Sequence, residues 1–181
     1  MNDANPLDAS SVFADSLPVP PSELYAQLDA EGVSYRLFEH VPLRTVEDSK
    51  QVEHLFGPRR PGHIHIKNLY LRDRKKRNYL VVLEQDYDLD LKGLGDRIGA
   101  GRLSFGSAER LFEYLGVRPG AVTPLAMITG VKTGVTLWMD PALKNSETVY
   151  PHPLVNDRTL AMTGVDLRRF LESLGVEINW L

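Results

Sequence analysis

The sequence contains no cysteine among its 181 residues. This absence excludes disulfide scaffolds, thiolate zinc sites and cysteine nucleophiles, and it fits a reducing compartment. Long apolar runs are also missing, since a run such as Leu80–Leu83 falls far short of the ~20 residues that span a bilayer. Residues 1–11 carry acids but no bases, unlike a signal peptide. We therefore expect a cytoplasmic protein with no membrane partner.

Several catalytic motifs are absent as well. No glycine-rich loop ends in the GK[ST] signature of phosphate-binding loops, and there is neither a G-x-S-x-G elbow nor an HExxH helix. His63 and His65 would share one face of a strand, which two metal ligands could do. Because spacing marks no third ligand, two surface histidines are the favoured interpretation. We expect no metal and no organic cofactor.

The charge balance is slightly acidic, with 21 Lys and Arg residues against 24 Asp and Glu residues, a net charge of −3. A chain of this sign repels phosphate as a whole, so a nucleic-acid partner would need a local basic patch, and DNA is not expected. The run Arg74, Lys75, Lys76 and Arg77 is the obvious patch. It is either a solvated turn or a phosphate-binding surface.

The length and a hydrophobic content of 43% predict one globular domain. Prolines 18, 20 and 21 favour an extended lead-in over residues 1–21, followed by a single domain over residues 22–181. Periodicity and capping residues predict helices over residues 22–31, 45–55, 89–98, 108–115 and 165–174.

Strands are expected over residues 33–40, 64–73, 79–84, 103–105, 125–128, 135–139, 148–150 and 158–162. The second and third of these, joined by the basic run, form an antiparallel hairpin pattern. Because strands and helices do not alternate regularly, the fold class is expected to be α+β with a mixed sheet.

Three positions stand out chemically. Lys67 shares a strand face with Leu69 and Leu71, so its ammonium either reaches past them to water or lies in a cleft. Gly120 opens a loop that ends at Pro124, which is either a plain turn or a place of close ligand approach. His152 lies between two prolines, which either shape a bend or direct the ring into a cleft.

Five motifs in register resemble the family of YbaK/prolyl-tRNA-synthetase-associated editing domains, particularly its free-standing ProX or PrdX type. They comprise residues 40–43 with 45–47, 66–73 with 79–83, 103–105 with 108–111, 120–124, and 152–154 with Asn156, and the likeness covers residues 22–175. The resemblance implies an α+β fold with a mixed, partly barrel-like central sheet flanked by helices. It also implies hydrolysis of mischarged aminoacyl-tRNA. The expected turn at residues 129–134 departs from the family pattern.

The resemblance further implies which residues act. Lys67, Gly120 and His152 match the catalytic positions of the family. The substrate-binding positions expected beside them are Asn68, Ala121, Val122, Thr123 and Pro124. On the ground of its charge, the run Arg74, Lys75, Lys76 and Arg77 is the expected tRNA-binding surface. Loop N–H groups would stabilise the oxyanion, and the free 2′-hydroxyl of the tRNA would assist the attack of water.

The resemblance implies that the substrate is alanyl-tRNA(Pro), which the protein would hydrolyse by trans-editing. It also implies prolyl-tRNA synthetase as a possible further partner. Cysteinyl-tRNA(Pro) is an alternative substrate that spacing does not separate from the first. A non-catalytic module that binds tRNA or a synthetase also remains open.

Overall fold

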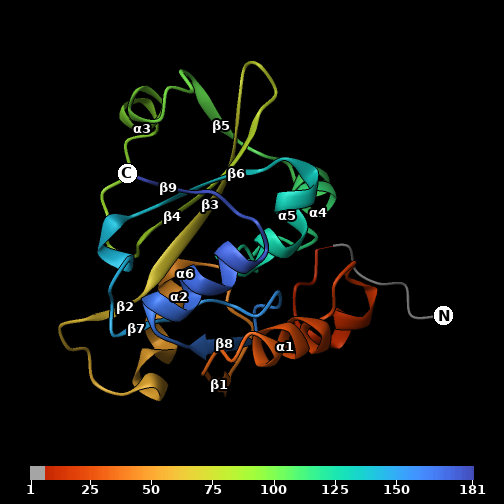
Figure 1. Cartoon of the computed structure of the whole chain (residues 1–181), viewed down its shortest axis with the longest axis vertical. Helices are drawn as coiled ribbons and strands as arrows, with labels where there is room; N and C mark the ends of the chain where they lie inside the picture. Colours follow the sequence, from red (N-terminus) through yellow and green to blue (C-terminus); the bar gives the residue numbers. More distant parts are fainter. Residues whose placement is uncertain (1–6) are drawn as a thin grey trace.

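The computed structural model describes residues 7–181, and a five-stranded mixed β-sheet forms its centre (Figure 1). In spatial order the strands are β5 (Leu103–Phe105), β3 (Ile66–Asp73), β4 (Asn78–Glu84), β6 (Thr136–Met139) and β9 (Ile178–Trp180). Side chains alternate between the two faces, and each face carries its own apolar cluster. The expected α+β class with a mixed sheet flanked by helices is confirmed.

The β3–β4 hairpin is the longest pairing in the sheet, and its register runs from Ile66 opposite Glu84 to Arg72 opposite Asn78. At the turn the carboxylate of Asp73 accepts hydrogen bonds from the backbone N–H and Nε of Arg77, at 2.9 and 2.6 Å. On its other side β3 pairs with β5 only over residues 71–73. Residues 66–69 therefore form a free strand edge.

Two small sheets lie beyond this free edge, at the opposite end of the molecule from the hairpin turn (Figure 1). In one, β1 (Arg36–Glu39) pairs antiparallel with β8 (Arg158–Ala161). In the other, β2 (His63–Ile64) runs parallel to β7 (Thr148–Val149). The expected strand over residues 64–73 is thus broken at His65, which separates β2 from β3.

The α-helices are α1 (Pro21–Ala30), α2 (Val46–Val52), α3 (Leu91–Arg97), α4 (Ala108–Leu115), α5 (Met127–Thr133) and α6 (Gly164–Ser173). Thr45 and Asp48 form a capping box at the start of α2, and Ser107 caps α4. The first helix begins at Pro21, one residue before the expected start at residue 22. None of the helices within residues 7–181 is long and apolar enough to cross a membrane.

The strand expected over residues 125–128 is wrong. Pro124 occupies the first turn of a 3-10 helix, η3 (Pro124–Ala126), and the Thr123 side chain accepts a hydrogen bond from the N–H of Leu125. Helix α5 follows directly and also replaces the turn expected at residues 129–134. A short apolar run has the same sequence pattern in a buried strand and in a buried helix. Because residues 124–128 are all buried, their pattern could not distinguish the two, and this explains the error.

The lead-in also differs from expectation. Residues 11–16 form a 3-10 helix, η1 (Ser11–Ser16), and are not extended. The N–H and hydroxyl of Ser11 donate to the Asp157 carboxylate, and Asn156 N–H donates to the carbonyl of Ala9. Residues 1–6 of the expected lead-in lie outside the described residues. The short strand β9 was not predicted.

Candidate active site

A pocket of about 230 Å³ opens beside the free edge of β3 and brings Lys67, Gly120 and His152 together. These residues come from a strand, a loop before η3 and a loop before β8, and they are far apart along the chain. The pocket is lined by Leu43, Arg44, Thr45, Val46, Ser49, Ile66, Lys67, Asn68, Leu69, Gly120, Val122 and His152. Convergence of the three positions on one cavity is what a shared chemical site requires.

Lys67 lies at the edge of this pocket. Its ammonium group donates a hydrogen bond to the backbone carbonyl of Tyr87, in the loop between β4 and α3. On the same face of β3, Leu71 is fully buried and Leu69 packs against the same apolar cluster. Lys67 thus lines the pocket, while its ammonium group is bonded to Tyr87, which does not.

Position 120 requires a glycine, both because of its backbone conformation and because its neighbours leave little space for a side chain. Its φ angle is +96°, and a Cβ added there would lie 3.1 Å from Asn156 Nδ2 and 3.2 Å from the carbonyl oxygen of Leu43. Those two groups hydrogen-bond each other at 2.8 Å, and Leu43 N–H returns a bond of 2.8 Å to the Asn156 carbonyl. Asn156 thereby holds the residue 43 loop directly against Gly120.

Residues 120–123 alternate between positions that line the pocket and positions that are buried in the core. Gly120 and Val122 line the pocket, and their N–H groups have no hydrogen-bond partner within residues 7–181. Ala121 and Thr123 are fully buried, and the N–H of Ala121 already donates to the Arg118 carbonyl at 3.0 Å. Of the five expected substrate-binding positions, only Asn68 and Val122 line the pocket, while Ala121, Thr123 and Pro124 support the loop from the core.

His152 is held in one orientation by its neighbours. Its Nδ1 lies 2.7 Å from the Arg158 carbonyl, which can only accept, so Nδ1 carries the proton and Nε2 keeps its lone pair. Burial lowers the pKa of His152 to about 4. The Thr159 hydroxyl lies 3.5 Å from His152 Nδ1 and 2.8 Å from His40 Nε2, so it links the two rings. A neutral His152 at pH 7 follows.

A second, smaller pocket of about 30 Å³ adjoins the first and shares Asn68 and His152 with it. Part of its wall is aromatic: the ring of Tyr150 stacks on His65 and Phe56, with centroids 4.5 and 5.1 Å apart. The Oδ1 atom of Asn68 is buried and has no hydrogen-bond partner among the described residues. No motif in the sequence marked Phe56, His65 and Tyr150 as neighbours, since they come from three separate segments.

An ion-pair network holds the wall of the smaller pocket in place. Glu53 opens the 3-10 helix η2 (Glu53–Phe56) and receives two bonds of 2.7 Å from Arg59. Gln85, just after β4, adds a 2.8 Å bond to the same carboxylate. Hydrogen bonds from Arg59 and Gln85 lower the pKa of Glu53, although burial opposes the shift. Phe56 is thus anchored through η2 to the end of β4.

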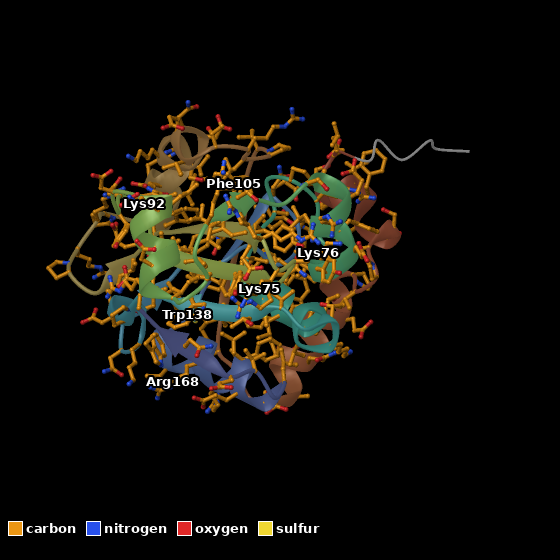
Figure 2. The ribbon with its side chains drawn as sticks, turned by 90° about the horizontal axis from the view of Figure 1, so that it is seen from above. Lys75, Lys76, Lys92, Phe105, Trp138 and Arg168 are labelled. Carbon is orange, nitrogen blue, oxygen red and sulfur yellow. The ribbon has the colours of Figure 1, made fainter. Side chains whose placement is uncertain are left out.

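The basic run lies far from the pocket. Lys67 and Asp73 are six residues apart on β3, which corresponds to about 20 Å of extended strand. Arg77 is exposed but paired with Asp73 at 2.6 Å, so the exposed cations at the turn without an ion pair among the described residues are Arg74, Lys75 and Lys76. Figure 2 labels Lys75 and Lys76 on the face that contains this turn. The structure does not bring the basic run into the pocket.

His63 and His65 are the candidate metal ligands of the sequence. No group of three or more His, Asp or Glu side chains that could hold a metal ion occurs in the part of the chain from residue 7 onward. His63 Nδ1 lies 2.8 Å from the Tyr150 hydroxyl, and His65 stacks on the same tyrosine. His63 therefore has a polar partner and His65 an aromatic one inside the fold, and neither is exposed, so the interpretation of them as two surface histidines is wrong.

Known proteins resemble this chain over most of its length. It is 36% identical over 151 residues to the prolyl-tRNA editing protein ProX of Acetoanaerobium sticklandii, covering 83% of this chain and 89% of the relative. A prolyl-tRNA synthetase associated domain-containing protein 1 of Danio rerio is 36% identical over 153 residues, covering 83% and 80%.

A crystal structure named as a candidate trans-editing enzyme for prolyl-tRNA synthetase superposes with a TM-score of 0.64 and 21% identity. The match covers 90% of this chain and 96% of that one, and at this identity it supports the fold alone. In sequence, the aminoacyl-tRNA editing domain matches residues 40–170, a span that contains Lys67, Gly120 and His152. The chain belongs to the aminoacyl-tRNA editing domain family.

Proposed function

We propose that this protein is a trans-editing deacylase that hydrolyses the ester bond of alanyl-tRNA(Pro). The observation that carries the proposal is the convergence of Lys67, Gly120 and His152 on one pocket. Family membership and the names of the relatives support an aminoacyl-tRNA substrate and proline tRNA in particular. Those names also make prolyl-tRNA synthetase a reasonable partner.

The reaction needs stabilisation of negative charge more than a protein nucleophile. Water attacks the ester carbonyl, the carbonyl oxygen becomes an oxyanion, and the bond to the tRNA ribose oxygen then breaks. The N–H groups of Gly120 and Val122 are the donors available to that oxyanion, because Ala121 N–H is already used within the loop. Preorganised donors of this kind typically contribute 10²- to 10³-fold each, about 3–4 kcal/mol.

Proton transfer completes the step. The attacking water loses one proton, and the departing ribose oxygen gains one, so the products are a free amino acid and tRNA with its hydroxyl restored. We assign assistance of the attack to the neighbouring 2′-hydroxyl of the substrate. The unprotonated Nε2 of His152 is suited to accept a hydrogen bond from that hydroxyl or from the water.

Selection by size follows from the smaller pocket. Its volume of about 30 Å³ is close to the space of a single water molecule, which suits a methyl side chain. The proline ring carries two more carbons, so a pocket of this size would reject it by steric clash. The partnerless Oδ1 of Asn68 is placed to accept a hydrogen bond from the substrate ammonium group. A cysteine side chain is one sulfur larger and is the nearest competitor.

The exposed cations of the hairpin turn would contact the tRNA away from its aminoacylated end. Because they lie about 20 Å along β3 from the pocket, they suit backbone phosphates of the acceptor arm. Their role is electrostatic attraction, which is sequence-independent.

The test is deacylation of alanyl-, cysteinyl- and prolyl-tRNA(Pro) by the purified protein, measured as loss of acid-precipitable labelled aminoacyl-tRNA. We expect rapid loss of alanine and no loss of proline. Faster loss of cysteine than of alanine would reassign the substrate. Inertness toward all three, with retained tRNA binding, would support a non-catalytic binding module and refute the deacylase.

A further inference from the structure

The pocket contains a second cation that neither the sequence motifs nor the proposed chemistry uses. Arg44 lines the pocket and its side chain is exposed. Its backbone is well held, because its N–H donates to Asp48 Oδ2 at 3.0 Å and the preceding Leu43 is bound to Asn156. The Cα of Arg44 lies 3.6 Å from the position a Cβ would take on Gly120. The side chain therefore starts directly beside the loop that would hold the ester carbonyl.

The two pocket cations differ in their partners. The ammonium of Lys67 is committed to the Tyr87 carbonyl. Arg44 takes part in no ion pair within 4 Å among residues 7–181. Of the neighbouring acids, Asp48 already accepts the N–H groups of residues 44 and 45, and Asp8 accepts that of Ser10. The Arg44 guanidinium is attracted by Asp8 and Asp48 but forms no direct ion pair with either, so it is available to a ligand at the pocket.

An arginine available beside the carbonyl site suits an anion attached to the same substrate. An amino acid esterified to the 3′-terminal nucleotide has one such anion nearby, the phosphate on the 5′ oxygen of the same ribose. A guanidinium presents paired N–H donors that match phosphate oxygens, and it remains protonated at any working pH. We propose that Arg44 binds the 5′-phosphate of the terminal nucleotide. This inference rests on the proposed deacylase function.

Phosphate binding by Arg44 also explains how a pocket in an acidic protein would accept a nucleotide. The chain carries a net charge of −3, so only local cations favour a phosphate at this position. The basic run cannot supply that charge, because it lies about 20 Å along β3 from the pocket. Arg44 would then contribute to substrate binding and not to the chemical step.

The test compares three alanyl esters: alanyl-tRNA(Pro), 2′(3′)-O-alanyl-AMP with a 5′-phosphate, and 2′(3′)-O-alanyl-adenosine without one. For Arg44→Ala we expect a rise in KM of about 10- to 100-fold on the two phosphate-bearing esters, with kcat nearly unchanged. On alanyl-adenosine the variant should match the wild type. Arg44→Lys should recover part of the loss, because lysine keeps the charge without the paired donors.

The control is Arg168→Ala, which removes the same charge from α6, where Arg168 pairs with Glu172 (Figure 2). It should leave all three esters unaffected. Equal losses for Arg44→Ala on AMP and adenosine esters, or no loss on either, would overturn the phosphate assignment while leaving the deacylase function intact. If the wild-type protein hydrolyses none of the esters, the proposed function itself fails.

Discussion

Substitution of Gly120 by alanine gives the sharpest test of the loop that borders the pocket. The added Cβ would meet Asn156 Nδ2 at 3.1 Å and the Leu43 carbonyl at 3.2 Å, and the residue would keep a φ angle of +96°. A positive φ costs an ordinary residue roughly 1–2 kcal/mol. Loosening the hydrogen bond between Asn156 and Leu43 adds about 1 kcal/mol. The expected loss of folding free energy is therefore about 2–3 kcal/mol.

A matched control separates backbone strain from crowding. Gly134 ends α5 with a φ angle of +79°, and nothing lies within 4 Å of its added Cβ. Gly134→Ala should therefore lose only the conformational part, about 1–2 kcal/mol. In thermal unfolding followed by circular dichroism, this difference corresponds to a further fall in Tm of about 2–4 °C for Gly120→Ala.

Activity should separate the two variants more strongly than stability. A displacement of the loop by a fraction of an ångström moves both N–H donors, and misplacement of about 1 Å can reduce rates ~10²-fold. We expect Gly120→Ala to lose most alanyl-tRNA(Pro) deacylation below its Tm, while Gly134→Ala keeps the wild-type rate. Equal Tm values for the two variants together with equal activity would refute this account of Gly120.

Three further predictions address other parts of the site. Lys67→Ala should reduce deacylation by about 100-fold or more while the fold is retained, and an unchanged rate would remove Lys67 from the site. Because burial lowers the pKa of His152 to about 4, kcat/KM should show no titration of this group between pH 6 and 8 and should fall only as the pH approaches 4. Stability should decline earlier than activity, as the pH falls from about 6.5 toward 4, because the unfolded chain binds that proton more tightly. A decline confined to pH above 7 would contradict the assignment. The double variant Lys75→Glu, Lys76→Glu should weaken tRNA binding. The negative slope of log K against log salt should become shallower by roughly 0.7–0.9 for each lost phosphate contact. An unchanged slope would identify the turn as solvated surface.

The arrangement assigns separate tasks to separate parts of the protein. The α2 and η2 segments form one wall of the pockets, and the network around Glu53 and Arg59 fastens that wall to the end of β4. The opposite wall is the free edge of β3, left open because β5 pairs only with residues 71–73. A substrate could therefore reach the carbonyl site without displacing a strand.

Local sequence signals were sufficient for much of the fold. The Thr45 and Asp48 capping box, the Ser107 cap and the alternating residues of the β3–β4 hairpin each depend on neighbours within a few positions. They were therefore predictable from periodicity and capping alone. The error at residues 125–128 has the opposite origin, because burial from all sides removes the periodicity that distinguishes a helix from a strand.

The sequence by itself determined the fold class, the absence of thiol chemistry and, through motif order, Lys67, Gly120 and His152 as positions of interest. Only the tertiary structure decided which loop N–H groups remain available, that Phe56, His65 and Tyr150 together line a small pocket, and that Arg44 lines the larger one without a direct ion pair among the described residues. The physical reason is distance along the chain. Capping and periodicity act over a few residues, whereas a pocket is assembled by contacts between segments up to about a hundred residues apart, which no local pattern records.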